Sequence, residues 1–242
     1  MYSGVPQHGY ARDCDFTLAE KTEDTLWFEL KADEFWKEKY PFDFLLRIGY
    51  RIDGCKVYVM WDVKNLGNEE MYFSIGAHPA FYCGIDASDF VKENGKEENT
   101  ADPKIGAGID FNKDIKTVRC DILNDKGVLG DRTKDLILDK GILKITEGLF
   151  EEDALIMESE DLSRISLLDK EGKAYLNVSF NAPMLGIWSP VGKNAPFVCI
   201  EPWYGRCDRF SFDGELQDRE YGNSVAPGEL FAREYIIEIT EE

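Results

Sequence analysis

Apolar and polar residues alternate with a period of two in the first clearly patterned region of the chain. Residues 44–50 are rich in Phe, Leu, Ile and Tyr, and residues 55–63 place valine and tryptophan at every second position. The segment 51–54 between them ends in Asp-Gly, which is a strong short-range signal for a hairpin turn. The pattern predicts two antiparallel strands, each with one face more apolar than the other.

Short segments of the same kind recur along the chain, separated by turn sequences rich in Asn, Asp and Gly. They are residues 71–75, 117–122, 136–138, 154–157, 164–168, 175–180, 197–200 and 234–239. Helical periodicity is confined to one or two turns within 33–39 and 140–150. Many short strands with regular turns predict an all-β fold, a large antiparallel β-sandwich. Because all-β chains of this length are commonly single domains, we expect one domain over residues 1–242.

Residues 86–114 interrupt this pattern with charged and small residues, most densely at 92–100. Such a composition buries little apolar surface, so the segment is expected to be an exposed, irregular loop. A lid over a substrate is the functional alternative, since long loops sometimes close over sites.

The charge balance argues against two classes of partner. The chain has 47 acidic and 28 basic residues and a formal net charge of −19. Nucleic acid and anionic lipid carry the same sign and would be repelled, so neither nucleic acid nor membrane is expected as a partner. An acidic surface that keeps the protein dispersed is the simplest explanation of the charge.

The six cysteines form no C-x-x-C pair, so the sequence predicts neither a zinc ribbon nor a redox motif. The sequence shows no secretory signal pattern and no run of about 18 apolar residues. We therefore expect reduced thiols in a cytoplasmic protein. Cysteines flanked by apolar residues, such as Cys199, are expected to be small buried hydrophobes.

Candidates for proton transfer are few, because the chain has only two histidines. His78 follows a β-prone run and precedes Pro79, so it is expected at a strand end. Glu201 ends a similar apolar run, where partial desolvation would raise its pKa and strengthen it as a base. The alternatives are a structural histidine and a rim carboxylate paired with Arg206.

Five short segments, in this order, resemble the galactose mutarotase (aldose 1-epimerase) family, most closely its bacterial branch. They are His8-Gly9-Tyr10-Ala11-Arg12-Asp13, Gly76-Ala77-His78-Pro79-Ala80-Phe81, Leu149-Phe150-Glu151-Glu152-Asp153-Ala154-Leu155-Ile156, Pro183-Met184-Leu185-Gly186-Ile187-Trp188 and Ile200-Glu201-Pro202-Trp203-Tyr204-Gly205. The resemblance implies the family's large β-sandwich with a sugar cleft on one concave face. Family members carry sheet before the first segment, whereas seven residues precede His8 here, so either the sequence is truncated within that sheet or the sandwich lacks its first strands. An arginine that this part supplies in the family is absent in either case.

The resemblance also implies roles at a catalytic site that uses neither metal nor cofactor. Glu201 would be the base at the anomeric hydroxyl of a sugar, and His78, as imidazolium, would be the acid at the ring oxygen. His8 would donate a hydrogen bond near that oxygen; an exposed histidine in a flexible segment is the alternative.

Three further residues are candidate substrate contacts. Asp153 matches a family position that accepts hydrogen bonds from sugar hydroxyls, although an acidic trio is often merely solvated. Trp188 would stack on a pyranose, with burial in the core as the alternative. Arg12 would contact a hydroxyl or phosphate, or else pair with a neighbouring aspartate.

The sequence therefore predicts an isomerase of carbohydrate metabolism that interconverts the α and β anomers of a hexose. A hexose 6-phosphate substrate would require several basic groups around the site, and the sequence of this acidic chain does not indicate them. A non-catalytic carbohydrate-binding or sugar-sensing domain is the alternative from another class, and two-carboxylate glycoside hydrolysis is a weaker one.

Overall fold

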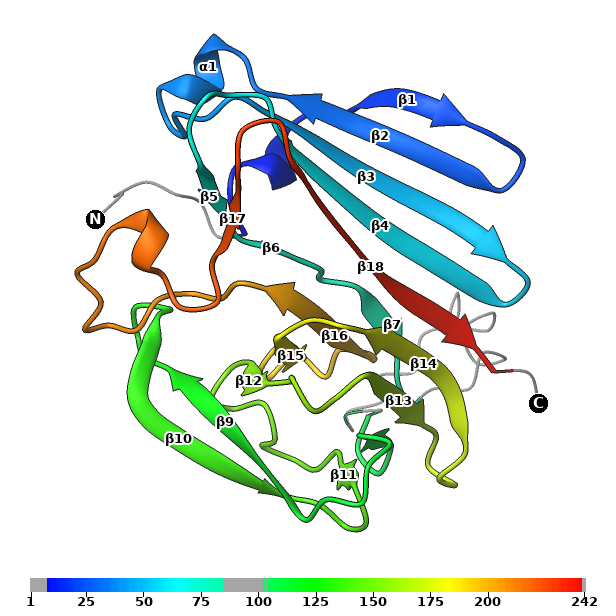
Figure 1. The fold of residues 1–242 in the computed structure, drawn as a ribbon. Coiled ribbons are helices and arrows are strands. Elements are labelled where there is room, and N and C mark those ends of the chain that lie inside the picture. Colours follow the sequence, from blue (N-terminus) through cyan, green and yellow to red (C-terminus); the bar gives the residue numbers. More distant parts are fainter. Residues whose placement is uncertain (1–7, 85–101, 103, 241–242) are drawn as a thin grey trace. The chain divides into compact units, whose positions relative to one another are not determined.

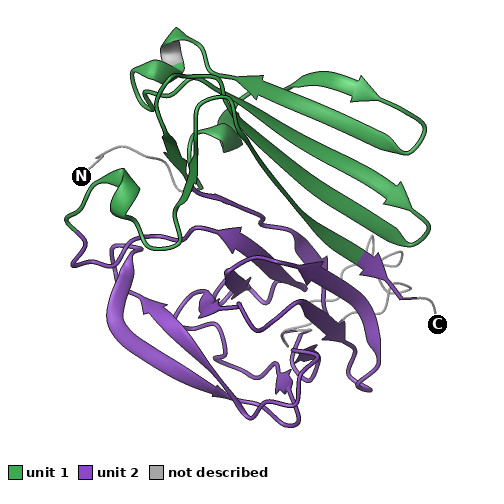
Figure 2. Cartoon of the chain, in the orientation of Figure 1, with its two compact units in different colours: residues 1–73, 213–237 green, residues 74–212, 238–242 purple. Residues whose placement is uncertain are grey.

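The computed structural model describes residues 8–84, 102 and 104–240 and divides the chain into two compact units. Unit 1 comprises residues 1–73 and 213–237, and unit 2 comprises residues 74–212 and 238–242 (Figure 2). Most of the regular structure is β-strand, and neighbouring strands run antiparallel, so the predicted all-β antiparallel class is confirmed. One domain over residues 1–242 stays a prediction.

Unit 1 is built on an antiparallel sheet whose strands follow the order β1-β2-β3-β4-β18 (Figure 1). A two-stranded ribbon of β5 and β17 and three short helices complete the unit. The elements are η1 (Ala11–Asp13), β1 (Thr17–Lys21), β2 (Thr25–Lys31), α1 (Glu34–Lys37), β3 (Phe44–Asp53), β4 (Lys56–Asn65), β5 (Met71–Phe73), η2 (Leu216–Asp218), β17 (Asn223–Val225) and β18 (Leu230–Ile239), whose last two residues belong to unit 2.

The β3–β4 hairpin confirms the period-two interpretation of the sequence. Val59, Trp61 and Val63 are buried on one face of β4, as the alternation predicts. The turn lies one residue later than the Asp-Gly signal predicts. Asp53 is still the last residue of β3, where it pairs with Lys56. Gly54 opens the two-residue turn with a φ of 59°, which glycine adopts without steric cost.

Unit 2 contains two sheets, with strand orders β14-β13-β8-β11 and β10-β9-β12-β15-β16-β6, and β7 also pairs with β16. Its strands are β6 (Ile75–Gly76), β7 (Ala80–Tyr82), β8 (Gly108–Asp110), β9 (Thr117–Leu123), β10 (Leu129–Ile137), β11 (Ile142–Lys144), β12 (Leu155–Glu158), β13 (Arg164–Leu168), β14 (Ala174–Phe180), β15 (Met184–Trp188) and β16 (Phe197–Tyr204).

The core of unit 2 is formed by strands whose residues are buried on both faces. In β13 and β15 four consecutive residues are buried, with Ile165 and Leu185 fully inaccessible. Each such side chain stabilises the fold by about 1.5–3 kcal/mol relative to its exposed state. The Tyr175 hydroxyl in β14 donates to the Tyr82 carbonyl in β7 and links the two sheets. The middle of the second sheet is therefore a firm support for β16.

Two sequence predictions are wrong within unit 2. Residues 107–111 are not an exposed loop, because β8 pairs with β11 and β13 and Ile109 is fully buried. Residues 85–101 and 103 of the expected loop lie outside the described residues. The short helix considered for 140–150 is replaced at residues 142–144 by β11. Both strands have three residues, too few to show a period, and their strand geometry comes from pairing with neighbouring strands.

Within the described part of the chain, neither α1 nor the two 3-10 helices have the length and hydropathy that a membrane span needs.

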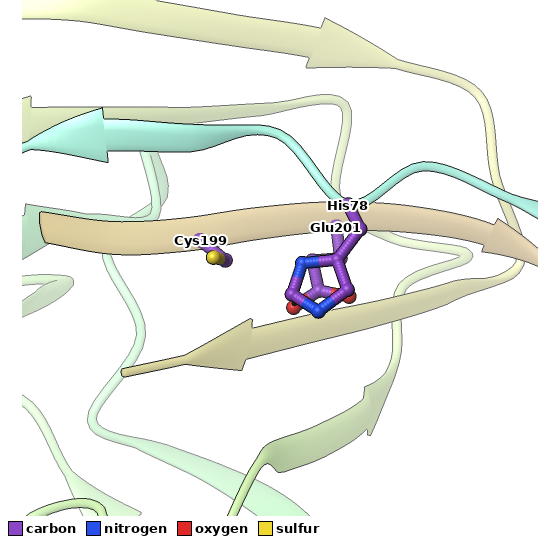
Figure 3. A group of neighbouring side chains, drawn as sticks. All are labelled: His78, Cys199 and Glu201. Atoms are coloured by element: carbon purple, nitrogen blue, oxygen red, sulfur yellow. Dashed lines mark ion pairs between the residues drawn. The ribbon is translucent and has the colours of Figure 1, made fainter. Parts of the chain in front are cut away.

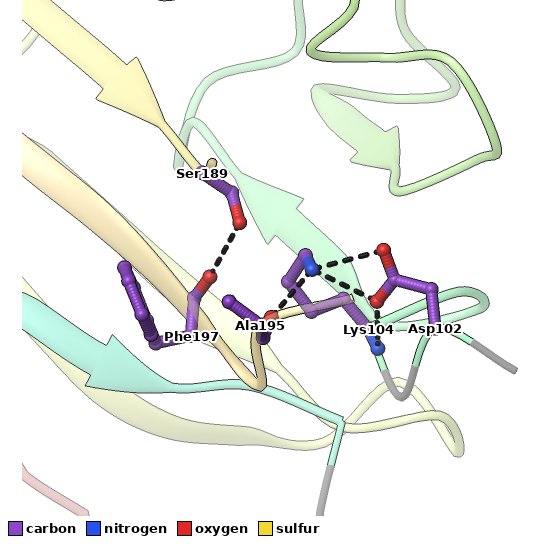
Figure 4. Close-up of polar contacts among 5 residues, drawn as sticks. All are labelled: Asp102, Lys104, Ser189, Ala195 and Phe197. Atoms are coloured by element: carbon purple, nitrogen blue, oxygen red, sulfur yellow. Dashed lines mark hydrogen bonds and ion pairs between the residues drawn. The ribbon is translucent and has the colours of Figure 1, made fainter. Parts of the chain in front are cut away.

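A buried lysine fastens the connection between β15 and β16 (Figure 4). The Lys104 side chain is 2% exposed, and its ammonium donates to both Asp102 carboxylate oxygens, at 2.8 and 2.9 Å, and to the Ala195 carbonyl. At the base of the same connection the Ser189 hydroxyl donates to the Phe197 carbonyl at 2.8 Å. A buried charge is tolerated only when it is paired and hydrogen-bonded, and Lys104 meets both conditions.

Asp102→Asn leaves that ammonium without its counter-charge. We expect the variant to lower the free energy of unfolding by about 2–4 kcal/mol, below the full cost of breaking a buried pair because Asp102 is partly exposed. Adding Lys104→Met should restore most of the loss, since an apolar side chain no longer needs the partner. Urea denaturation of the wild type, the single variant and the double variant measures both effects. Equal losses in both variants would contradict this account.

Candidate functional site

The register of β16 with its neighbours brings His78 and Glu201 together. Gly76 in β6 pairs with Trp203, and Ala80 in β7 pairs with Cys199, so the same register sets His78 opposite Glu201. Backbone hydrogen bonds from Ala77 to Pro202 and from Ile200 to Pro79 hold the connection between β6 and β7 against β16. Residues directly opposite each other on antiparallel strands project from the same face, with their Cβ atoms about 5 Å apart.

The two side chains form a pair with unequal access to solvent. His78 Nδ1 lies 3.3 Å from Glu201 Oε1, and the imidazole is drawn over the carboxylate in Figure 3. The histidine side chain is 38% exposed, whereas the glutamate side chain is 5% exposed. One partner can therefore meet a ligand from solution while the other is screened from water.

Burial changes the acid–base behaviour of Glu201. Desolvation raises the pKa of its carboxyl to about 8, because the protein interior disfavours the charged form. The negative charge of Asp153 raises the pKa further, and a hydrogen bond from the Trp203 indole opposes the rise. A carboxylate with this pKa is a stronger base than a solvated one and titrates near neutral pH.

Trp203 fills the space beside Glu201 because two neighbouring positions lack side chains. Ideal Cβ atoms built on Gly76 and Gly186 would each lie 2.5 Å from the indole. Gly186 in β15 also pairs directly with Glu201. The Trp203 indole N–H donates to the Ala77 carbonyl at 3.1 Å, next to His78 in the chain. The Trp203 indole therefore packs against β6 and β15 as well as its own strand β16, and it supports both His78 and Glu201.

Trp188 joins the pair to a neighbouring cavity. It pairs with Cys199 across β15 and β16, and its ring meets the His78 ring edge-on, with the centroids 5.6 Å apart. Trp188 and Asp153 both line a cavity of about 610 Å³, within the range of about 300–1,000 Å³ typical of small-molecule sites. His78 and Glu201 are not among the lining residues, so the cavity lies beside the pair.

The cavity lining is polar and carries both signs of charge. Asp153 is exposed, with a φ of 73°, and follows Glu151 and Glu152. Arg132 forms an ion pair with Glu152, and Lys193 lines the same cavity. Hydroxyl groups of a sugar can both donate to such carboxylates and accept from such cations.

His8 and Arg12 belong to unit 1, whereas the other candidates belong to unit 2. His8 is exposed with a φ of 67°, and partial burial, followed by the charge of Arg12, lowers its pKa. Arg12 forms a two-point ion pair with Asp13, its neighbour in the chain, at 2.8 and 2.9 Å. This is the surface pair that the sequence offered as the alternative to a substrate contact. The place of both residues at the site stays a prediction.

Sequence reasoning missed the roles of Cys199 and Gly186. Cys199 is buried, as expected, yet one ligand atom from each of Cys199, His78 and Glu201 lies within 4.8 Å of the others, so the three could hold a metal ion. The sequence did contain a signal for Cys199, because it lies two residues before Glu201 on one strand, and that spacing puts both side chains on the same face. For Gly186 no signal existed, because the indole that needs the space comes from the next strand.

The variant Gly186→Ala tests how closely the Trp203 indole packs against Gly186. The new methyl group would collide with the indole, so we expect a loss of about 1–3 kcal/mol in the free energy of unfolding. Gly130→Ala is a matched control in the same sheet, because its Cβ would meet only an ordinary contact of 3.5 Å. Chemical denaturation compares the two variants. Equal stability would show that the indole moves aside without cost.

Comparison with solved structures finds the same fold in lactobacilli. A galactose mutarotase related enzyme from Lactobacillus acidophilus has a TM-score of 0.82 and 29% identity, over 98% of this chain and 75% of that one. A galactose mutarotase-like protein from Lactobacillus casei has a TM-score of 0.82 and 21% identity, over 98% and 76% of the two chains. Protein LacX (plasmid) of Lactococcus lactis is 28% identical, over 97% of this chain and 75% of its own length.

A family model described as aldose 1-epimerase matches residues 3–230. The match spans most of the chain and includes all five segments on which the resemblance rests. An isomerase-type enzyme with a sugar substrate is the function class that the comparisons support. The chain belongs to the aldose 1-epimerase family.

Proposed function

We propose that the protein is an aldose 1-epimerase that interconverts the α and β anomers of a hexose by acid–base ring opening. The observation that carries the proposal is the cross-strand pair of His78 and Glu201, with its 3.3 Å contact and its buried, weakly acidic carboxyl. One base and one acid are sufficient for this reaction. The family match and the mutarotase-related structure support the same activity.

In the proposed mechanism Glu201, as carboxylate, takes the proton of the anomeric hydroxyl. Electrons from that O–H bond form the aldehyde carbonyl as the bond between C1 and the ring oxygen breaks. His78, as imidazolium, gives its proton to the ring oxygen, which becomes the C5 hydroxyl. After rotation about the C1–C2 bond, Glu201 returns its proton to the carbonyl oxygen and His78 takes one from the hydroxyl. Ring closure gives the other anomer and restores both groups.

We assign substrate contacts to the residues beside the pair. Asp153 would accept hydrogen bonds from sugar hydroxyls, and Trp188 would stack on an apolar face of the pyranose. The cavity that both residues line supports this assignment. His8 and Arg12 are assigned as further contacts from the family motif.

Removing either group should abolish most of the catalysis. We expect Glu201→Gln and His78→Asn each to lower the rate in excess of buffer by about 10²–10⁴-fold, the usual contribution of a positioned acid or base. Polarimetry with freshly dissolved α-anomers of glucose and galactose measures the rate. Glu171→Gln, in an exposed turn of unit 2, is the matched control and should behave as wild type. Undiminished rates in both site variants would contradict the mechanism.

The same assay separates an enzyme from a sugar-binding domain. If the wild type relaxes the optical rotation no faster than buffer while calorimetry shows that it binds the sugar, the carbohydrate-binding alternative replaces this proposal.

The pH dependence should follow the ionisation of Glu201. Because the reaction needs the Glu201 carboxylate and the His78 imidazolium at the same time, the excess rate should depend on pH in a bell shape, with one limb near pH 8, the pKa that burial gives Glu201. The folded-state pKa lies above the unfolded value, so this group's contribution to the free energy of unfolding is full below about pH 4.5 and is lost as the pH rises through about 8. Denaturation of wild type against Glu201→Gln isolates that loss. A pH profile without a limb near pH 8 would contradict the role of burial.

A further inference from the structure

Cys199 brings a third potential ligand to the face of the sheet that carries the pair. It lies two residues before Glu201 on β16 and projects to the same side (Figure 3). One ligand atom of each of His78, Cys199 and Glu201 lies within 4.8 Å of the other two. The mechanism proposed above uses the imidazole and the carboxyl but has no use for the thiol.

This donor set suits a metal ion of the zinc class. Zinc prefers thiolate, imidazole and carboxylate ligands, and its bond lengths of about 2.0–2.3 Å put tetrahedral ligands about 3.5 Å apart. The His78–Glu201 contact of 3.3 Å already has this spacing, and the half-exposed imidazole can adjust toward the thiol. Three protein ligands would leave a fourth position for water.

Charge also favours a cation at this point. Asp153 lies close enough to act on the Glu201 carboxyl, and it adds negative potential without being a ligand. A thiol must lose its proton to bind a divalent cation, so binding releases that proton to solvent, and a thiolate, a carboxylate and a neutral imidazole then face the dication.

We propose that His78, Cys199 and Glu201 form a binding site for a thiophilic divalent cation, and that its occupancy reversibly blocks the enzyme. The block follows because a metal-bound imidazole cannot act as imidazolium and a metal-bound carboxylate cannot accept the anomeric proton. The inhibition rests on the proposed function, whereas the metal site does not.

The first experiment measures binding without any sugar. Metal-free protein in a non-chelating reductant is titrated with Co²⁺, whose bond to a thiolate gives a near-ultraviolet charge-transfer band, and Zn²⁺ is then used to displace it. We expect the band in wild type and in Cys120→Ala, which removes another buried thiol. Cys199→Ala should lose the band and bind Zn²⁺ at least about tenfold more weakly, as expected for the loss of a ligand. Cys199→Ser serves if the alanine variant does not fold.

Two binding results would overturn the site: the absence of a thiolate band in wild type, or a band that Cys199→Ala leaves unchanged in intensity and midpoint. The second result would assign the binding to another cysteine, such as the exposed Cys55.

The second experiment measures the excess mutarotation rate against Zn²⁺. We expect inhibition that a chelator reverses in wild type and Cys120→Ala, and at least about a tenfold higher half-inhibitory concentration for Cys199→Ala, with the rate of each protein normalised to its own rate without metal. Equal sensitivity of all three proteins, or cobalt binding without inhibition, would overturn the block. If no protein shows mutarotation, the proposed function fails and the cobalt titration still decides the metal site.

Discussion

The antiparallel register between β16 and the β6–β7 segment is the constraint on which the candidate site depends. It sets His78 opposite Glu201, although 122 residues separate them in the chain. A slip of one residue would turn the histidine to the other face of the sheet. The register is fixed on both sides of the pair, since Gly76 and Ala80 each have a defined partner. The position of His78 relative to Glu201 is therefore fixed as firmly as the strand pairing itself.

Burial then decides what the pair can do. β15 and β16 are inaccessible along most of their length, so the carboxyl of Glu201 is desolvated and its pKa rises to about 8. Lys104, in the same unit, is a buried ionisable group of the opposite kind, because its ammonium has both a counter-charge in Asp102 and a hydrogen bond to the Ala195 carbonyl. The lysine is a structural charge with its counter-charge in place. Glu201 instead faces an imidazole that solvent can reach, which leaves both able to exchange protons.

Proton transfer and metal binding call on the same properties. A weakly acidic, desolvated carboxyl and a half-exposed imidazole suit acid–base chemistry, and with a thiol beside them they also resemble a zinc site. Cys199 is the residue that separates the two uses, because the proposed ring opening does not require it. The three-strand support around Trp203 serves both, since it fixes Glu201 relative to its neighbours on β15 and β6.

The sequence by itself determined the all-β class, the β3–β4 hairpin and the candidates His78 and Glu201, because alternation, turn residues, scarce histidines and short family motifs are local properties. It missed β1, β2, β8, β11 and β15 and misjudged residues 107–111. The three-residue strands β8 and β11 carry no period and become buried only through their partners. The contact between His78 and Glu201, the space that Gly186 leaves for the indole and the approach of Cys199 were decided only by the tertiary structure. Each depends on a neighbouring strand, and cross-strand register is not written in any single segment.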